Sequence, residues 1–283
     1  MNGISYLGKI KVGLGETVRI ISIINLSPES FYQNSVVTER GELTEKIISS
    51  LEEGASIVDL GGMSTAPYKS TYVSEEIELE RIMWALNAIN EAGISAEISI
   101  DTQRSRVMEE ALKRGATIIN DVSGLSDRRA PQVIKDYGAS LILCAAGDAA
   151  GSRDPLGFII RALNNSLSIA ESAGIDRSKI VIDPAIGFFR NAVIPSHDWD
   201  STVIANLGKI KKALELPVLV GVSRKSFIGS ITGEGDPNKR LSGSLAAAAI
   251  AVFNGADAIR THDVAETAKA VRVAEYLRSK ISF

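Results

Sequence analysis

The sequence predicts a single-domain α/β protein with the (β/α)8 architecture of a TIM barrel, covering residues 1–283 with a core at about residues 18–280. Eight short apolar runs recur at intervals of roughly 20 to 40 residues, and a helical pattern follows each run. The runs are continuous in Ile and Val, which indicates parallel strands buried on both faces. No Gly/Ser-rich linker divides the sequence. A doubly wound open sheet is the alternative, because strand counts taken from sequence carry error.

The predicted strands are apolar runs that each end in polar or small residues. In chain order they are RIISIINL (19–26), ASIVDLGG (55–62), AEISIDT (96–102), TIINDVSG (117–124), SLILCAAG (140–147), KIVIDPAIGF (179–188), PVLVGVSRKS (217–226) and DAIRTHD (257–263). The residues between successive runs leave room for the helical crossover that joins parallel strands.

The helices between these strands have recognisable ends. Ser74 is a predicted N-cap, and Glu75 and Glu76 follow it in the first turn, where the helix dipole favours negative charge. Apolar residues at helical spacing fill residues 79–89, and Gly93 is a predicted C′ residue.

Two further helices are predicted from similar patterns. Residues 104–116, RSRVMEEALKRGA, contain apolar i, i+4 pairs and end at Gly115. The run LAAAAIAVF, Leu245–Phe253, is too short to span a bilayer and predicts a buried helix.

Composition narrows the class of protein. A formal net charge of −3 argues against a nucleic-acid partner, because such proteins normally present a basic field. Residues 1–19 lack the apolar stretch of a signal peptide. The single cysteine, Cys144, excludes an intramolecular disulfide and fits a reducing compartment. The sequence therefore predicts a soluble, cytoplasmic protein without a membrane partner.

Polar side chains gather where the predicted strands end. They are Asn25, Asp59, Asp101, Asn120, Asp121, Asp183, Arg224, Lys225, Arg260, His262 and Asp263. A lone Asp after a strand is usually a turn or capping residue, and Asp59 and Asp121 could have that role or brace neighbouring loops. Because the strand ends of a barrel converge on the face that holds active sites, so many polar residues together predict a site.

The last two strand ends predict an anion site. The loops after the seventh and eighth strands of a barrel often bind phosphate, and here they carry Ser223–Ser226 and Arg260–His262. The planar donor fork of Arg and the point charge of Lys together suit a phosphate or pyrophosphate. The alternative is a pair of solvated ion pairs with Asp198 or Asp263. With only two histidines in the sequence, a zinc site is not expected.

Carboxylates are expected to face those cations across the opening. Asp101 and Asp183 can each accept two parallel hydrogen bonds from neighbouring N–H donors, and Asn120 can both donate and accept. Such a cavity suits a ligand with a guanidine-like edge and an anionic tail, for example a 2-amino-4-oxo heterocycle carrying phosphate.

The motifs at these strand ends resemble those of the dihydropteroate synthases. IINLSPESF resembles that family's Asn-Val-Thr-Pro-Asp-Ser-Phe signature. Six further segments resemble its remaining motifs in the same order: GASIVDLGGMSTAP, ISIDT, ATIINDVSG, VIDPAIGF, VLVGVSRKSFIG and AIRTHD. The resemblance runs from about Arg19 to Arg278 and implies a pterin-binding (β/α)8 barrel.

The resemblance also implies roles for individual positions. The pterin ring is expected to be held by Asp101, Asn120, Asp183 and Lys225. Arg260, His262 and Asn25 match the pyrophosphate site, with Asn25 also at the end that binds Mg2+. The implied catalytic residues are Lys225, Arg260 and His262.

The implied reaction condenses 6-hydroxymethyl-7,8-dihydropterin diphosphate with an aminobenzoate-type arylamine and releases pyrophosphate. Thr65, Pro67, Arg224 and Ser226 match positions around the arylamine, and Phe31 lies in the family's first mobile loop. The family also implies a homodimer, with residues 242–253 and 264–278 as the expected contact.

The sequence departs from the family where the arylamine is enclosed. Gln33 and Ala66 stand where the family has Asp and Arg, and Phe189-Arg190 replaces a common Gly-Lys. These changes leave open a bulkier amine, such as the ribofuranosyl-aminobenzene phosphate of methanopterin-type pathways. They also leave open a pterin-binding methyltransferase of the same barrel class and a non-catalytic pterin-binding paralogue.

Overall fold

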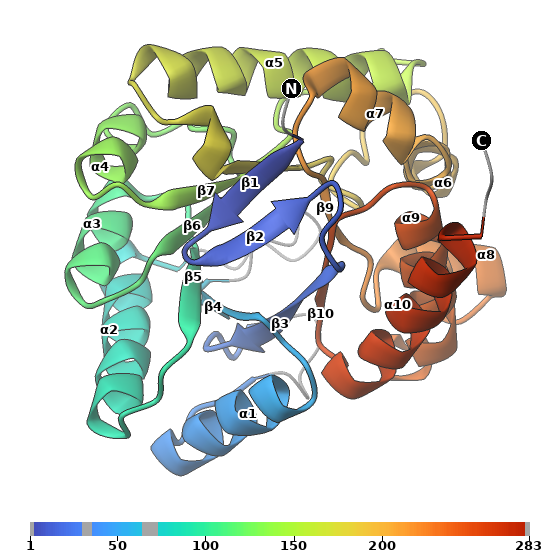
Figure 1. Ribbon diagram of the computed structural model, residues 1–283. Helices are drawn as coiled ribbons and strands as arrows, with labels where there is room; N and C mark the ends of the chain where they lie inside the picture. Colours follow the sequence, from blue (N-terminus) through green and yellow to red (C-terminus); the bar gives the residue numbers. More distant parts are fainter. Residues whose placement is uncertain (1–2, 30–35, 64–72, 281–283) are drawn as a thin grey trace.

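The computed structural model describes residues 3–29, 36–63 and 73–280, which form an eight-stranded parallel barrel surrounded by helices (Figure 1). The barrel strands are β3 (Arg19–Asn25), β4 (Ile57–Gly61), β5 (Glu97–Asp101), β6 (Ile118–Asp121), β7 (Ser140–Cys144), β8 (Ile180–Asp183), β9 (Leu219–Gly221) and β10 (Ala258–Thr261). They pair in the order β8-β7-β6-β5-β4-β3-β10-β9. A parallel bridge between Ile182 and Val218 joins the two ends of this order. The predicted (β/α)8 barrel and all eight predicted strands are confirmed.

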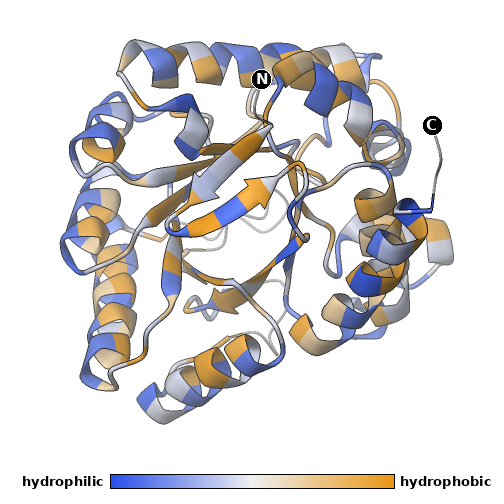
Figure 2. Cartoon of the chain, in the orientation of Figure 1, coloured by the Kyte–Doolittle hydropathy of each residue, from blue (hydrophilic) through white to orange (hydrophobic). Residues whose placement is uncertain are grey.

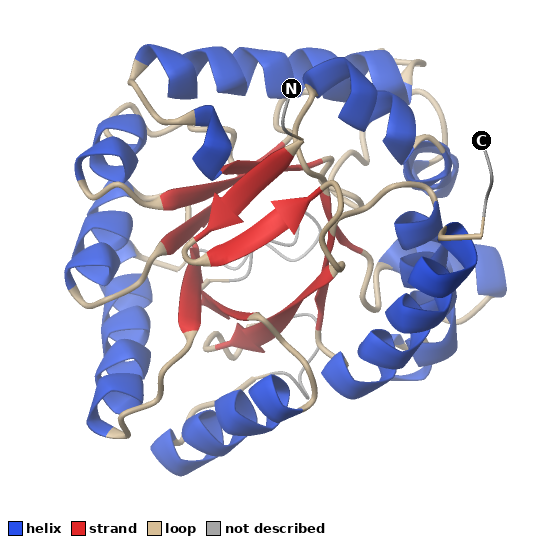
Figure 3. Ribbon diagram, in the orientation of Figure 1, coloured by secondary structure: helices blue, strands red, loops and turns tan. Residues whose placement is uncertain are grey.

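The helices lie outside the ring of strands, as Figure 3 shows. They are α1 (Arg40–Glu52), α2 (Glu75–Glu91), α3 (Ser105–Lys113), α4 (Ala130–Asp136), α5 (Pro155–Ser172), α6 (Ser196–Ala205), α7 (Leu207–Leu214), α8 (Ser226–Thr232), α9 (Leu241–Phe253) and α10 (Val264–Arg278). The predicted N-cap of α2 is confirmed, because Ser74 Oγ accepts a hydrogen bond from Ile77 N at 3.3 Å. Gly93 and Gly115 follow α2 and α3 with positive φ angles of 65° and 100°, as C′ residues do.

The outer core lies between the strands and the helices. Side chains such as Val58, Leu60 and Ile100 point outward from the sheet and are fully buried against the helices. In Figure 2 the barrel strands are mainly hydrophobic, whereas the helices carry hydrophilic residues on their outer faces. This pattern explains why the strands appear in the sequence as unbroken apolar runs.

The inside of the barrel is filled by layers of four side chains that alternate strands contribute. Along the hydrogen bonds of the sheet, Arg260 stands beside Ile21 and Ile21 stands beside Ile57. Because the strands of a closed barrel are tilted, a layer moves forward by two residues from one alternate strand to the next, so Arg260 shares its layer with Asp59 and not with Ile57. Following this two-residue step around the ring defines each layer. The two layers nearest the amino ends are Ala258, Ile57, Ile118 and Val181, and then Ile21, Ser99, Ile142 and Leu219. All eight side chains are buried.

The composition of the layers changes toward the carboxyl ends of the strands. By the same register, the third layer is Arg260, Asp59, Asn120 and Asp183, and the fourth is Ile23, Asp101, Cys144 and Gly221. An apolar foot thus supports a polar upper half, and the barrel itself positions the functional side chains.

An N-terminal hairpin that the sequence patterns did not predict covers the foot of the barrel. Strands β1 (Ile4–Leu7) and β2 (Ile10–Gly13) pair antiparallel and lie across the amino ends of the barrel strands (Figure 1). Leu7 and Val12 are fully buried against the lowest layers. Two short runs around Gly8-Lys9 were the available signal, since a two-residue turn between such runs indicates a hairpin.

The helix predicted for Leu245–Phe253 is confirmed as part of α9, but it is not buried on all sides. Ile250 and Phe253 are 54% and 45% exposed. On the neighbouring α10, Val273, Tyr276 and Leu277 are also exposed. Among the described residues, no helix is both long enough and apolar enough to cross a membrane.

Candidate active site

Acidic and basic side chains from opposite parts of the sequence meet at the carboxyl ends of the barrel strands. Arg260 in β10 donates through its Nη2 to Asp101 Oδ2 at 2.8 Å, although the two residues are 159 positions apart in the sequence. Lys225, after β9, reaches the loop that follows Asp183 at the end of β8, because its Nζ donates to Ile186 O at 2.8 Å. The predicted convergence of acidic and basic strand ends is therefore present in the structure.

Arg260 lies among the carboxylates rather than opposite them. Its Nε donates to Asp59 Oδ2 at 2.6 Å, and its Nη2 donates to Asp101. Although burial disfavours the cation, the nearby charges of Asp59 and Asp101 hold the pKa of Arg260 above its ordinary value. The prediction that carboxylates and cations face each other across the opening is wrong for Arg260.

Asp101 combines burial with an unused acceptor. Burial raises the pKa of this carboxyl to about 7; the charge of Arg260 opposes the shift, and that of Asp59 adds to it. Asp101 Oδ1 is buried and has no hydrogen-bond partner within the described part of the chain. Because a buried acceptor without a partner is costly, this oxygen is well suited to an N–H donor of a ligand.

Asp183 and Lys225 form the other side of the opening. Asp183 Oδ1 accepts from Ala185 N at 2.7 Å, and burial raises the pKa of Asp183 to about 6. Lys225 Nζ donates to Ile186 O at 2.8 Å and lies 4.6 Å from the centre of the Phe188 ring. Burial lowers the pKa of Lys225, while the charge of Asp183 opposes that shift.

The loop after β8 is shaped to hold Lys225 in place. Gly187 has a φ angle of 84°, and a Cβ atom there would lie 3.0 Å from Lys225 Cδ. Its backbone N donates to the buried Asp200 Oδ1 at 2.8 Å. A glycine is therefore required both by the backbone conformation and by the close approach of the lysine stem.

Asn120 and Cys144 lie next to each other in the upper layers. Asn120 Nδ2 donates to Asp59 Oδ2 at 3.1 Å, and Cys144 Sγ lies 3.7 Å from Asn120 Oδ1. Burial raises the pKa of Cys144 well above its ordinary value, so the thiol stays protonated. Cys144 is the one cysteine of the sequence, and by the strand register it shares the fourth layer with Asp101.

His262 is uncharged in this environment. Its Nδ1 lies 2.9 Å from Ser223 Oγ. Burial, with the nearby charges of Arg260 and Arg224, lowers the pKa of His262 well below its ordinary value. A neutral imidazole at this position can donate a hydrogen bond but does not supply a positive charge.

Comparison with known proteins agrees with this geometry. The family model described as "Pterin binding enzyme" matches residues 21–262. Dihydropteroate synthase of Escherichia coli K12 is 35% identical over 263 residues, which cover 90% of each chain. The chain belongs to the dihydropteroate synthase family of pterin-binding enzymes. The resemblance recognised in the sequence motifs is confirmed.

Solved structures of this family have the same fold. A Coxiella burnetii dihydropteroate synthase in complex with pteroic acid is 33% identical, with a TM-score of 0.84 and 98% of each chain covered. The Xanthomonas albilineans enzyme with 4-aminobenzoic acid is 32% identical, with a TM-score of 0.85 and 100% of each chain covered. Members of the dihydropteroate synthase family are transferases. As a member of this family, the chain is a transferase.

Arg224, which the family match places near the arylamine, is held by bonds within the chain. Its Nε and Nη2 donate to the two oxygens of Asp263 at 2.9 and 2.6 Å, and its Nη1 donates to the carbonyl oxygens of Pro237 and Asn238. The side chain is 6% exposed. Arg224 thus anchors the loop after β9, and its contact with the arylamine stays a prediction. The alternative expected from the sequence was a solvated ion pair with Asp198 or Asp263. The pair between Arg224 and Asp263 is present, but it is largely buried.

The expected arylamine positions are only partly described. Thr65, Pro67, Phe31, Gln33 and Ala66 lie outside the described residues. Ser226 begins α8, and its Oγ accepts a hydrogen bond from Nη2 of the exposed Arg190.

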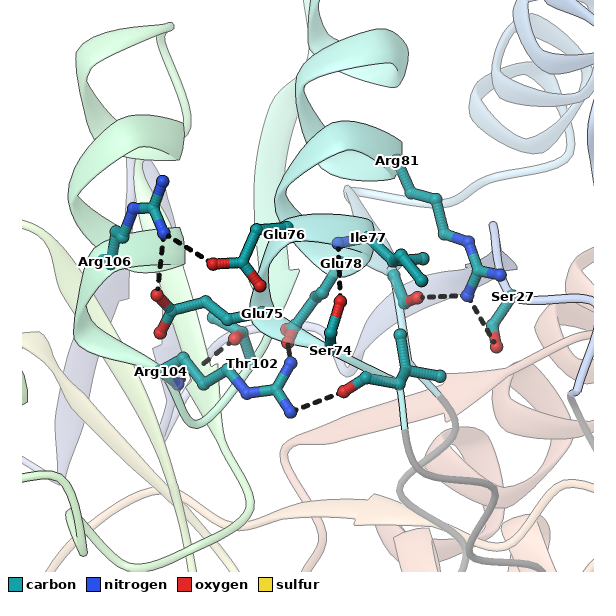
Figure 4. Close-up of polar contacts among 12 residues, drawn as sticks. Ser27, Ser74, Glu75, Glu76, Ile77, Glu78, Arg81, Thr102, Arg104 and Arg106 are labelled. Atoms are coloured by element: carbon teal, nitrogen blue, oxygen red, sulfur yellow. Dashed lines mark hydrogen bonds and ion pairs between the residues drawn. The ribbon is translucent and has the colours of Figure 1, made fainter.

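Two arginines that the sequence patterns did not single out fix the chain next to the segments 30–35 and 64–72. Arg81 on α2 donates to Glu29, to Ser27 Oγ and to Gly62 O, so it ties the ends of β3 and β4 to this helix. Its hydrogen bond is the main reason that the pKa of Glu29 is lowered to about 2. Figure 4 shows Arg81 pointing toward Ser27.

Arg104 has the corresponding place on the other side of α2. Its Nη2 donates to Val73 O at 2.7 Å and its Nη1 to Glu78 Oε2 at 2.6 Å (Figure 4). Glu78 is fully buried in α2, and burial raises its pKa. The sequence offered one signal, because a glutamate on the buried face of a helix requires a cation nearby.

Proposed function

We propose that this chain condenses 6-hydroxymethyl-7,8-dihydropterin diphosphate with a p-aminobenzoate-type arylamine and releases pyrophosphate, in the biosynthesis of folate or a related pterin. The observation that carries this proposal is that Asp101, Asp183, Lys225 and Arg260 lie together at the carboxyl ends of the barrel strands. The pteroic acid bound to the Coxiella burnetii enzyme and the 4-aminobenzoic acid bound to the Xanthomonas albilineans enzyme support the same reaction.

The carboxylates and the lysine recognise the pterin. A 2-amino-4-oxo ring presents adjacent N–H donors, which suit Asp183 and the buried Asp101 Oδ1. Lys225 donates on the carbonyl side of the ring. The carboxylates also stabilise the electron-poor ring that forms as the exocyclic carbon–oxygen bond breaks.

The basic residues stabilise the leaving diphosphate. Arg260 provides charge, and the neutral His262 provides a hydrogen bond. The amine attacks after the bond to the diphosphate has broken, so a strong general base is not required.

We propose that Mg2+ accompanies the diphosphate. The described residues contain no group of three or more His, Cys, Asp or Glu that could hold a metal ion. Asn25 offers a hard carboxamide oxygen, Oδ1, at the end of β3. This oxygen lies beside Gly61 of β4, where a Cβ atom added to the glycine would be 3.6 Å from it. One protein ligand fits an ion that takes its other oxygens from diphosphate and water. When bound, such an ion would neutralise charge on the leaving group.

A pyrophosphate-release assay with two amines tests the function. The chain is mixed with the pterin diphosphate and either 4-aminobenzoate or the ribofuranosyl-aminobenzene phosphate, with Mg2+ or with a chelator. Release with one amine identifies the second substrate, and Arg190 beside Ser226 is compatible with either a carboxylate or a phosphate. If calorimetry detects binding of the pterin but no pyrophosphate is released with either amine, the chain would instead be a non-catalytic paralogue. The named relatives are synthases, which disfavours a methyltransferase.

Replacing Asp183 by Asn is expected to weaken pterin binding by about 1.5–3 kcal/mol, because a hydrogen bond to a charged acceptor is lost. Asn can still accept from Ala185 N, so the loop should keep its shape. Isothermal calorimetry with the pterin measures the change. Asp154→Asn is the control, because Asp154 is an exposed N-cap of α5, where Asn caps equally well. Equal affinities for wild type and Asp183→Asn would show that the pterin is held elsewhere.

Pterin affinity is expected to fall as the pH decreases from 8 to 5. The carboxylates accept ligand N–H groups through both oxygens, and more strongly, when they are ionised, and burial has raised their pKa values to about 7 for Asp101 and about 6 for Asp183. The decline should therefore lie between about pH 7 and 6 rather than near pH 4. Calorimetry across this range measures it. An affinity that stays constant down to pH 5 would contradict the assignment.

We also propose that the chain forms a homodimer through α9 and α10 and works in the cytoplasm. The exposed apolar side chains Ile250, Phe253, Val273, Tyr276 and Leu277 lie on these two adjacent helices and support the contact. The buried free thiol of Cys144 is compatible with a reducing compartment. Sedimentation of the wild-type chain and of Ile250→Asp would measure the dimer.

A further inference from the structure

Asp59 joins two residues of the opening although the sequence suggested only a capping or bracing role. It lies in β4, and its side chain is fully buried. A single oxygen, Oδ2, accepts from Arg260 Nε at 2.6 Å and from Asn120 Nδ2 at 3.1 Å. One carboxylate therefore holds both a residue expected at the diphosphate and a residue expected at the pterin ring.

The barrel register explains this arrangement. β4 stands two strands from β6 on one side and two strands from β10 on the other. Alternate strands fill one layer of a barrel, and Asp59 stands in the third layer between Arg260 and Asn120. Its place is set by the sheet and not by a loop, so its geometry is rigid.

The contact with Asn120 decides which atom of the amide is available. Because Nδ2 donates to Asp59, the amide is held with Oδ1 directed elsewhere, 3.7 Å from Cys144 Sγ. Without Asp59 the amide could rotate by half a turn and exchange its donor and acceptor. Asp59 thus selects the hydrogen-bonding character that Asn120 presents.

The contact with Arg260 fixes the plane of the guanidinium. Asp59 holds Nε and Asp101 holds Nη2, so two carboxylates grip two atoms of one planar fork. If Asp59 were absent, Asp101 alone would hold the fork at a single nitrogen and the group could pivot about that bond.

We infer that Asp59 is a positioning residue that aligns Arg260 for the diphosphate and Asn120 for the pterin ring, and this inference rests on the proposed function. It acts through these two residues and does not touch the reacting atoms. Removing it should mainly lower kcat through Arg260 and weaken pterin binding through Asn120.

A double-mutant cycle tests the inference. Asp59→Ala is expected to lower kcat by about 10- to 100-fold, the scale of a misplacement near 1 Å. In an Arg260→Ala background the same change should lower kcat less than about threefold, because the residue that Asp59 aligns is already gone. Asp59→Asn keeps an acceptor oxygen for both donors and should restore part of the loss.

Asp121→Ala is the matched control. Asp121 is also a fully buried carboxylate, at the end of β6, but it accepts from Ser123 and Leu125 in a turn. Its replacement should lower the melting temperature with little change in the kcat of the folded fraction. If Asp59→Ala does not fold, Asp59→Asn takes its place in the cycle, with a smaller loss expected.

Two results would overturn the inference: wild-type kinetics and pterin affinity after Asp59→Ala, or an equal loss of kcat in both backgrounds. A wild-type chain that releases no pyrophosphate would refute the proposed function instead. In that case calorimetry with the pterin diphosphate decides about Asp59. Equal affinities of wild type and Asp59→Ala for the pterin diphosphate would then refute the inference. A loss of affinity that Asp59→Ala causes in the wild-type background but not in the Asn120→Ala background would support it.

Discussion

Replacing Arg260 by alanine is expected to reduce kcat by about 100- to 1,000-fold, the usual cost of removing a preorganised group that stabilises transition-state charge. The guanidinium is held by Asp59 and Asp101, and so it requires little reorganisation as negative charge develops on the diphosphate. Steady-state pyrophosphate release measures the change. Because charge builds up only as the bond breaks, kcat should fall more than pterin affinity does.

Loss of Arg260 also leaves Asp59 and Asp101 without their cation, so stability must be followed separately. Arg260→Lys keeps the positive charge but not the planar fork, and it should recover stability better than turnover. Arg106→Ala is the control, since Arg106 is half exposed and pairs with Glu75 and Glu76 on the protein surface. A folded Arg260→Ala chain with wild-type kcat would show that the diphosphate binds elsewhere.

Replacing Arg104 by alanine is expected to lower the free energy of unfolding by about 3–5 kcal/mol, because one partner of a buried ion pair would remain without its counter-charge. That partner is Glu78, whose side chain is 0% exposed. The change also removes the donor to Val73 O, which fixes the chain before α2. Urea denaturation followed by circular dichroism measures the difference.

The neighbouring Arg106 and a double variant make this experiment specific. Arg106→Ala removes a nearby arginine, but its ion pairs are exposed and little change in stability is expected. Arg104→Met combined with Glu78→Gln removes both charges and should recover part of the loss. If Arg104→Ala were as stable as Arg106→Ala, the buried pair would not contribute to stability.

The barrel was predictable because its signal is repeated and local. Each buried parallel strand appears as a run of Ile and Val that ends in polar residues, and the eight runs occur in regular order. The hairpin Ile4–Gly13 was missed because its two strands have four residues each and its role, covering the barrel foot, depends on contacts far away in the sequence.

The candidate site was predictable in composition but not in side-chain direction. The strand ends that carry Asp101, Asp183 and Arg260 converge in any closed barrel. The orientation of Arg224 depends on a loop in which its φ angle is 56° and on the position of Asp263, and no sequence pattern indicates either. The sequence suggests a capping or loop-bracing role for Asp59, whereas counting by twos from the inward-facing Ile57 places it inside the barrel.

The most direct test is the stoichiometry of the reaction catalysed by the wild-type chain. With the pterin diphosphate, Mg2+ and the preferred arylamine, one pyrophosphate should appear for each pteroate-type product, and Arg260→Ala should slow both equally. If neither 4-aminobenzoate nor the phosphorylated arylamine gives product while the pterin still binds, the residues at the strand ends hold the ring without performing the condensation, and the chain is not a synthase.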